Sequence, residues 1–118
     1  MKQNVLKDKS FLFAIRIINL YKFLKAEHKE FVLSKQIIRS GTSVGALVRE
    51  AEHGESIKDF VHKLSISLKE INETEYWLDL LFATDFINEK MYQSLKKDCE
   101  ELLKLLTASV KTSKLRIK

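Results

Sequence analysis

Apolar residues recur along this chain at the three- and four-residue spacing that places them on one face of an α-helix. The spacing predicts four helices, over about residues 10–27, 31–53, 56–84 and 88–113, joined by connections of a few residues each. Short connections make consecutive helices antiparallel. The predicted fold is therefore all-α: a single domain over residues 1–118, built as an up-down-up-down antiparallel four-helix bundle.

Several residues suit the ends of these helices. Asp8 or Ser10 is the expected N-cap of the first helix, because short polar side chains accept hydrogen bonds from the first free N–H groups. Ser56 begins a sequence resembling a capping box at the third helix, and Asn88 is the expected N-cap of the fourth. Gly54 is expected to end the second helix in the left-handed conformation.

The first helix is apolar over most of its circumference instead of along a single stripe. In a small bundle, such a helix has one apolar face that the other three helices do not cover. Either another part of the chain covers that face or a second subunit does, and we favour the subunit. A second apolar line on the third helix is another candidate contact. The residues assigned to the subunit interface are Phe13, Ile17, Leu20, Ile66 and Trp77.

The second helix has small residues in its interior, where each glycine costs about 1 kcal/mol relative to alanine. They are Ser40, Gly41, Thr42, Ser43 and Gly45. Such a helix usually presses closely against another backbone. We therefore expect it to be packed on two sides.

Composition agrees with long helices, since the 118 residues include no proline and only three glycines. The single cysteine, Cys99, falls on the apolar stripe of the fourth helix and is expected in the core. One cysteine allows no intrachain disulfide, which suits a reducing compartment. No uncharged apolar run reaches the length of a membrane helix, and charges occupy the place of a signal-peptide core. We expect a cytoplasmic protein with no membrane partner.

The formal net charge of +5 is unevenly distributed. Residues 47–101 hold seven Lys/Arg and thirteen Asp/Glu, whereas the rest of the chain holds fourteen Lys/Arg and three Asp/Glu. This asymmetry favours either a basic side that attracts polyanions or a solvated surface with a basic tail, expected to be flexible from about residue 112. The residues assigned to nucleic-acid binding are Lys22, Lys25, Lys29, Lys35, Arg39, Lys111, Lys114, Arg116 and Lys118.

Candidate catalytic and metal sites are weak. Glu50 and His53 have the Glu-x-x-His spacing of di-iron bundles, and Asp59 with His62 approximates it. Both pairs lie near one turn, however, whereas a complete site needs ligands from four helices. No nucleophile–base spacing or Gly-rich phosphate loop occurs. We expect no metal, no cofactor, no catalytic residue and no enzymatic activity.

An acidic cluster lies on the third helix, at Glu70, Glu73 and Glu75. It makes that helix a poor surface for nucleic acid, because carboxylates repel phosphates. Glu75 falls near the apolar stripe, where an ionised carboxylate needs a partner. The expected partner is a polar residue on the second helix: Arg39, Ser40 or Ser43.

The second and third helices also resemble a known family. The pattern runs Gln36-Ile37-x-Arg39-Ser40-Gly41-Thr42-Ser43-Val44-Gly45-Ala46, then Glu50-Ala51, Asp59-Phe60, Ser67-Leu68-Lys69-Glu70 and Glu73-Thr74-x-Tyr76-Trp77-Leu78. It resembles the four-helix-bundle proteins encoded by intervening sequences in bacterial 23S rRNA genes. The accessory variability determinant of diversity-generating retroelements is a related member.

The resemblance implies a bundle that assembles into a homopentameric, barrel-like ring with basic surfaces. It implies that some relatives bind nucleic acid and, in retroelements, a reverse transcriptase. It carries over no catalytic residues.

Three functional hypotheses follow. The first is a non-enzymatic oligomeric bundle that binds RNA or DNA backbones through its basic surfaces. The second is a protein–protein scaffold, or an accessory subunit for a partner such as a reverse transcriptase. The third, which we favour least, is a di-iron carboxylate bundle.

Overall fold

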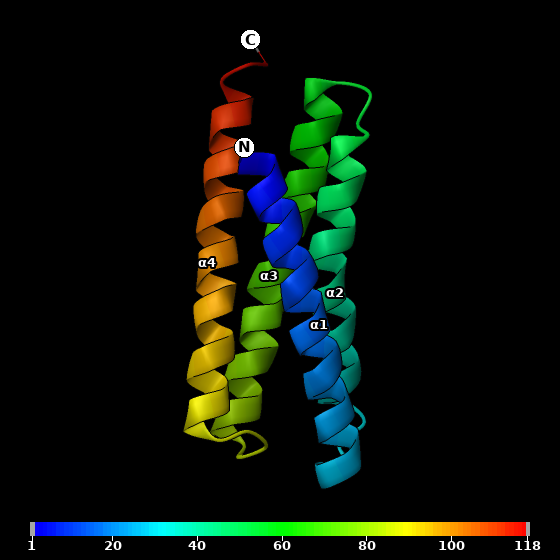
Figure 1. Cartoon of the computed structure of the whole chain (residues 1–118), viewed down its shortest axis with the longest axis vertical. Coiled ribbons are helices and arrows are strands. Elements are labelled where there is room, and N and C mark those ends of the chain that lie inside the picture. Colours follow the sequence, from blue (N-terminus) through cyan, green and yellow to red (C-terminus); the bar gives the residue numbers. More distant parts are fainter. Residues whose placement is uncertain (1, 118) are drawn as a thin grey trace.

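The structure, a computed structural model, describes residues 2–117, and the side chains from residue 5 onward. The molecule is elongated and measures 49 × 21 × 20 Å. Its helices run alternately up and down, so that consecutive helices are antiparallel (Figure 1). The described part of the chain has no strand. The helices are α1 (Lys2–His28), α2 (Leu33–Glu52), α3 (Ile57–Ala83) and α4 (Glu89–Lys114). The predicted all-α fold and up-down order are confirmed.

Neighbouring helices do not pack equally closely. α2 packs against α1 and α3, and α3 also packs against α4, whereas α1 and α4 make far fewer contacts. In Figure 1, α1 begins beside α4 and descends toward the lower end of α2. Polar contacts from two residues of α1 hold it to α4. Arg16 donates to Asp98 Oδ2 at 2.7 Å and to Ser94 Oγ at 2.8 Å, and Lys9 Nζ lies 3.0 Å from Glu101 Oε2. Because α1 and α4 make the fewest contacts of the packed helix pairs, the seam between them is the most open in the bundle.

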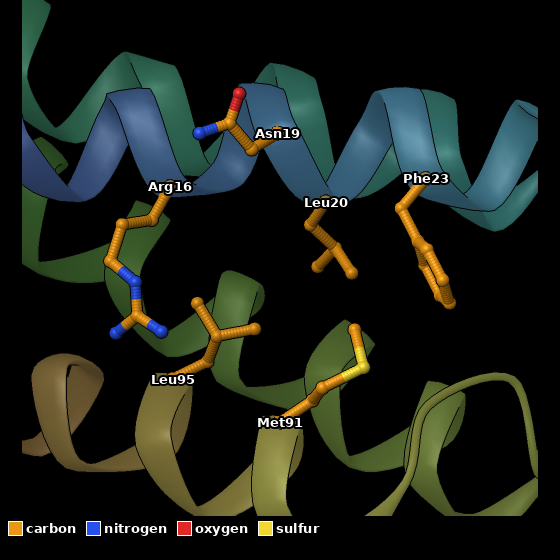
Figure 2. Close-up of a pocket in the computed structure, with 6 residues that line it drawn as sticks. All are labelled: Arg16, Asn19, Leu20, Phe23, Met91 and Leu95. Atoms are coloured by element: carbon orange, nitrogen blue, oxygen red, sulfur yellow. The ribbon is translucent and has the colours of Figure 1, made fainter.

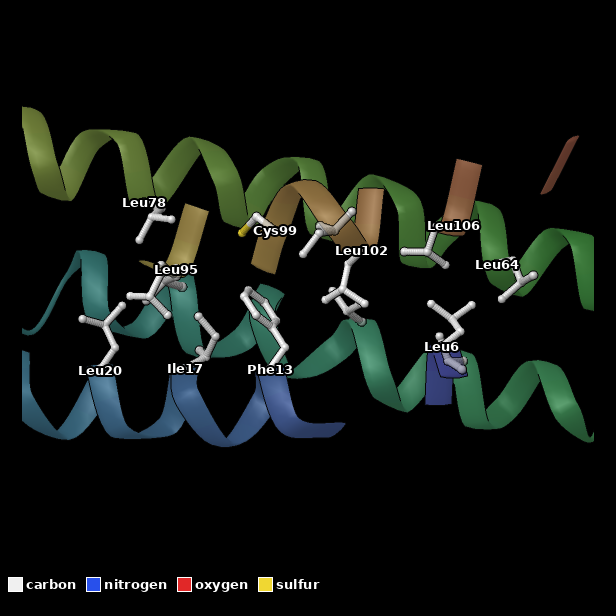
Figure 3. Packing of buried hydrophobic residues seen from close by; sticks show 14 of the residues in the cluster. Leu6, Phe13, Ile17, Leu20, Leu64, Leu78, Leu95, Cys99, Leu102 and Leu106 are labelled. Atoms are coloured by element: carbon white, nitrogen blue, oxygen red, sulfur yellow. The ribbon is translucent and has the colours of Figure 1, made fainter. Parts of the chain in front are cut away.

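The core runs along all four helices, and Figure 3 shows part of it from close by. Its largest fully buried side chains come from all four helices and include Phe13, Ile17, Ile37, Leu64, Leu78 and Leu102. Cys99 is fully buried among them, as predicted. Hydroxyl groups add polar contacts between α2 and α3. Ser67 Oγ donates to the carbonyl of Val44 at 2.9 Å, and Thr74 Oγ1 lies 2.8 Å from Ser40 Oγ.

The small residues of α2 let α1 approach closely. A Cβ added at Gly41 would lie 2.8 Å from Cγ1 and 2.9 Å from Cγ2 of Ile17. A Cβ at Gly45 would lie 3.3 Å from the backbone oxygen of Ser10. A different side of α2, which includes Ser40 and Val44, packs against α3. The expectation that this helix is packed on two sides is confirmed.

The first helix begins earlier than predicted. α1 already includes Lys2, because Leu6 is buried in the core and adds one more turn to the apolar face. Asp8 and Ser10 are therefore interior residues, and the prediction that one of them is the N-cap is wrong. The Ser10 hydroxyl instead donates to the carbonyl of Lys7 at 3.1 Å.

The predicted caps of the later helices are confirmed. Ser56 accepts a hydrogen bond from the N–H of Asp59 at 3.1 Å, and Asn88 accepts one from that of Met91 at 2.8 Å. The prediction for Gly54 is wrong, because no glycine in the described chain has a positive φ. α2 ends instead in a tight turn in which the N–H of Gly54 donates to the carbonyl three residues earlier.

None of the helices, over residues 2–117, is long and apolar enough to cross a bilayer.

Candidate interaction surfaces

α1 is apolar on two opposite sides. Its inner side is buried against α2 and the core. On the other side lie five large apolar residues that are exposed, which we call the outer face of α1: Val5 (41% exposed), Phe11 (53%), Leu12 (60%), Ile15 (42%) and Ile18 (37%). At the helical spacing these residues lie together. The expected apolar surplus of this helix is therefore present in the structure.

The interface assignment on α1 requires a correction. Phe13, Ile17 and Leu20 are only 2%, 0% and 4% exposed, so they belong to the core and cannot contact a second copy in this fold. The error has a physical cause, because a helix that is apolar all round gives no sequence signal of which side faces inward. Ile66 and Trp77 are partly exposed, and their assignment stays a prediction.

The outer face of α1 is a ridge with a groove on each side. Between α1 and α4 lies a pocket of about 240 Å³, toward which Arg16, Leu20 and Phe23 extend from one helix and Met91 and Leu95 from the other (Figure 2). A second pocket, of about 210 Å³, lies between α1 and α2. Its lining includes Phe11, Ala14, Gly45 and Arg49, and the guanidinium of Arg49 lies 5.6 Å from the centre of the Phe11 ring.

The basic residues assigned to nucleic-acid binding do not form one surface. Lys22, Lys25, Lys29 and Lys35 lie around the turn between α1 and α2, at the lower end of Figure 1. The basic residues near the C-terminus lie at the upper end, about the length of the 49 Å molecule away. They are Lys111, Lys114 and Arg116, whereas Lys118 lies outside the described residues. The sequence could not reveal this separation, because it depends on the helix directions and lengths.

Arg39 differs from the other assigned residues, because its charge is already compensated. Its guanidinium binds Glu70 at 3.2 Å and also binds Glu73. The Trp77 indole N–H donates to Glu73 at 2.9 Å, and together with Arg39 it lowers the pKa of the Glu73 carboxyl. We therefore correct the assignment of Arg39: it joins α2 to α3.

The ion pairs of the described chain explain how the acidic segment is accommodated. Every acidic partner in them lies within residues 47–101. Four of the basic partners come from outside that segment: Lys7, Lys9, Arg16 and Arg39. Apart from Arg39, none of the assigned basic residues described here forms an ion pair, so no carboxylate compensates their charges.

Glu75 has a different partner from the one predicted. Lys96 on α4 lies 3.3 Å from Glu75 and 2.8 Å from Asp79, so the prediction of a partner on α2 is wrong. Partial burial lowers the pKa of Lys96, but its hydrogen bonds to Asp79, Tyr92 and Glu75 outweigh this and raise it. This cluster ties α3 to α4. Within residues 5–117, no buried side-chain polar atom lacks a hydrogen-bond partner.

The residues weighed for metal binding do not converge. His53 and His62 are exposed, and Glu50 pairs with Lys63 at 3.0 Å. In the described part of the chain, no three His, Cys, Asp or Glu side chains are grouped so that they could hold a metal ion.

Burial, with a smaller contribution from Glu75, raises the pKa of the Cys99 thiol to about 12, which makes it a poor nucleophile.

Comparison with known proteins places the chain in a family. The family model for the 23S rRNA-intervening sequence protein matches residues 2–108. A crystal structure of a protein of unknown function from the S23 ribosomal protein family, from Bacteroides thetaiotaomicron, superposes with a TM-score of 0.93. That protein is 59% identical, and the match covers 94% of this chain and 99% of that one. No curated protein matches the sequence. With the four-helix fold and a match along nearly its whole length, this chain belongs to the family of 23S rRNA-intervening sequence proteins.

Proposed function

We propose that this protein is a non-enzymatic, self-associating bundle that binds RNA or DNA backbones through basic side chains. The observation that carries the proposal is the outer face of α1, an exposed apolar surface on a chain whose unpaired charges are mainly basic. The resemblance noted in the sequence favours five copies in a ring. A cytoplasmic location would give such a protein access to nucleic acid.

Self-association is supported by the shape and chemistry of α1. Phe11, Leu12, Ile15 and Ile18 are exposed side by side, and burying such side chains is worth about 25 cal/mol per Å² of apolar surface. Contiguous exposed apolar surface is typical of protein–protein contacts. The grooves on both sides of the ridge provide concave surfaces into which a neighbouring ridge can pack.

Light scattering coupled to size exclusion tests this part of the proposal. Five copies of the 13.8-kDa chain would have a mass of about 69 kDa. Ile15→Glu should lower the mass, because it places a charge within the apolar contact. Ile57→Glu is the matched control, since Ile57 lies on another helix and is equally exposed, at 42%. A monomeric wild-type protein would overturn self-association.

Nucleic-acid binding is supported by the charge distribution. The acidic segment is largely engaged in ion pairs, whereas the lysines at both ends of the bundle are not. Lysine and arginine contacts to phosphates release counterions, so affinity should fall steeply with salt. A titration of labelled RNA and duplex DNA against salt tests this. Weak binding with no salt dependence would overturn it, and replacing Lys111, Lys114, Arg116 and Lys118 with Gln measures the contribution of the C-terminal group.

The alternative function is a scaffold or accessory subunit for another protein, such as a reverse transcriptase. The outer face of α1 also favours this, because an apolar ridge can receive a different protein as well as a second copy. A pull-down from the native host with wild-type and Ile15→Glu proteins separates the two. A partner protein lost with Ile15→Glu, in the absence of nucleic-acid binding, would favour the scaffold.

A further inference from the structure

Lysines recur along α4 at an interval of seven residues. They are Lys90, Lys97, Lys104 and Lys111, and all four are exposed. Seven residues are almost two turns of an α-helix, so the four lie on one side of it, drifting by only about 20° per interval. At a rise of 1.5 Å per residue, successive lysines are about 10 Å apart and the row is about 30 Å long.

The row lies on the side of α4 that faces away from the bundle. The buried residues of this helix, among them Leu95, Cys99, Leu102 and Leu106, lie on the opposite side. Packing therefore does not explain the regular spacing.

The charges of the row are not compensated within the described chain. None of the four lysines forms an ion pair. Two acidic residues lie beside the row, Glu100 and Glu101, and Glu101 pairs with Lys9 at 3.0 Å. Beyond Glu101 the sequence has no acidic residue. The row is therefore most strongly basic toward the C-terminal end of α4.

The shape of the row distinguishes between nucleic acids. A duplex strand winds around its axis once per roughly 34 Å, so a nearly straight row about 30 Å long meets each strand only about once. An extended single strand can run alongside α4 and place a phosphate near every lysine. The only aromatic residue of α4, Tyr92, stacks on Phe82 at 4.2 Å between ring centroids and is not on the row. The row of α4 therefore offers no aromatic side chain on which a base could stack, and its contacts are with the nucleic-acid backbone.

We infer that α4 is a track for single-stranded nucleic acid, bound through its phosphates along Lys90, Lys97, Lys104 and Lys111. This inference rests on the proposed function and assigns the binding surface to the outer side of one helix. Binding is largely independent of base sequence, and RNA and single-stranded DNA bind alike. Four contacts give a slope of about −2.8 for log K against log salt, or a loss of about 50-fold in affinity between about 50 and 200 mM.

Two variants with the same change of charge test the inference. The row variant carries K97Q and K104Q, and the control carries K58Q and K69Q, two exposed lysines of α3 that form no ion pair in the described chain and are not assigned to binding. Glutamine and lysine have similar helix propensities, and circular dichroism checks the fold of both. Fluorescence anisotropy with labelled oligo-U, oligo-dT and a duplex DNA, at several salt concentrations, gives the slopes. The row variant should lose about 1.4 of the slope of about 2.8 for both single strands, because two of four phosphate contacts are removed, and the control should retain it.

The outcomes separate the inference from the proposed function. If the wild-type protein shows no salt-dependent binding, both fail. If the wild type binds but the row variant keeps its slope, or the control loses as much, the track is wrong and the proposed function stands. If the row variant changes the oligomeric mass, the row is a subunit contact and the inference is overturned. A wild-type preference for the duplex would also contradict it.

Discussion

Gly41 is the position at which the packing of α1 against α2 can be tested most directly. Replacing it with alanine adds one methyl group, and that carbon would lie 2.8 and 2.9 Å from two side-chain carbons of Ile17. Carbon atoms at their optimal separation are about 3.5–4.0 Å apart. The new methyl group therefore overlaps Ile17 by close to one ångström, and either side chain or helix must move.

The expected cost is the difference between two opposing effects. Overpacking a core costs about 1–3 kcal/mol, and Ile17 lies at the upper end because it is fully buried and has few rotamers as a β-branched residue. Alanine in place of glycine favours the helix by about 1 kcal/mol. Gly41→Ala should therefore lower the free energy of unfolding by about 2 kcal/mol.

A double-mutant cycle with Ile17→Ala isolates the clash. That substitution removes both contacting carbons, so adding Gly41→Ala to it should be neutral or stabilising by up to about 1 kcal/mol. Gly45→Ala is the control, since its added carbon would lie 3.3 Å from the Ser10 carbonyl and need only a small shift. Guanidinium unfolding followed by circular dichroism gives the free energies, at one protein concentration because self-association adds stability. If Gly41→Ala lowers the free energy of unfolding by the same amount in the wild type and in Ile17→Ala, the clash with Ile17 is refuted.

Two further predictions concern buried polar groups. The folded-state pKa of Cys99, about 12, lies above the ordinary thiol value, so the stability it contributes is complete below about pH 9 and is lost as pH rises toward 12. Above about pH 9, the free energy of unfolding should therefore fall less steeply with pH in Cys99→Ala than in the wild type. An equally steep fall in both proteins would contradict this. Thr74→Val removes a hydroxyl that lies 2.8 Å from Ser40 Oγ and should cost about 1 kcal/mol. In thermal unfolding, adding Ser40→Ala to Thr74→Val should cost less than Ser40→Ala costs alone. If the two losses of stability simply add, the pairing of these hydroxyls is contradicted.

Much of the fold could be predicted from the sequence, because its determinants are local. Helical spacing gave four helices, and Ser56 and Asn88 gave two of their starts. The start of α1 could not be predicted in the same way. Its first turns are held by the burial of Leu6, a tertiary effect, whereas Ser10 resembles a cap in sequence alone. Gly54 shows the same limit, since the turn geometry there needs no left-handed residue.

The candidate surfaces were only partly predictable. The sequence indicated surplus apolar surface on α1, but it could not tell Ile15 from Ile17, because both sides of that helix are apolar. Charge composition likewise could not separate Arg39, which is paired across helices, from Lys35, which is not. The seven-residue spacing of lysines in α4 was a readable signal, and its meaning depended on knowing that this side of the helix faces solvent.

The two proposed surfaces are compatible with each other. The outer face of α1 and the lysine row of α4 each lie opposite the core stripe of their own helix, and the outward sides of neighbouring helices in a bundle point in different directions. Self-association through α1 would therefore leave the row open. Each added copy would bring another set of four phosphate contacts to the same strand, at a high effective concentration. Weak contacts along a single helix could in this way give firm binding by the assembly, and Ile15→Glu should weaken that binding without removing a positive charge.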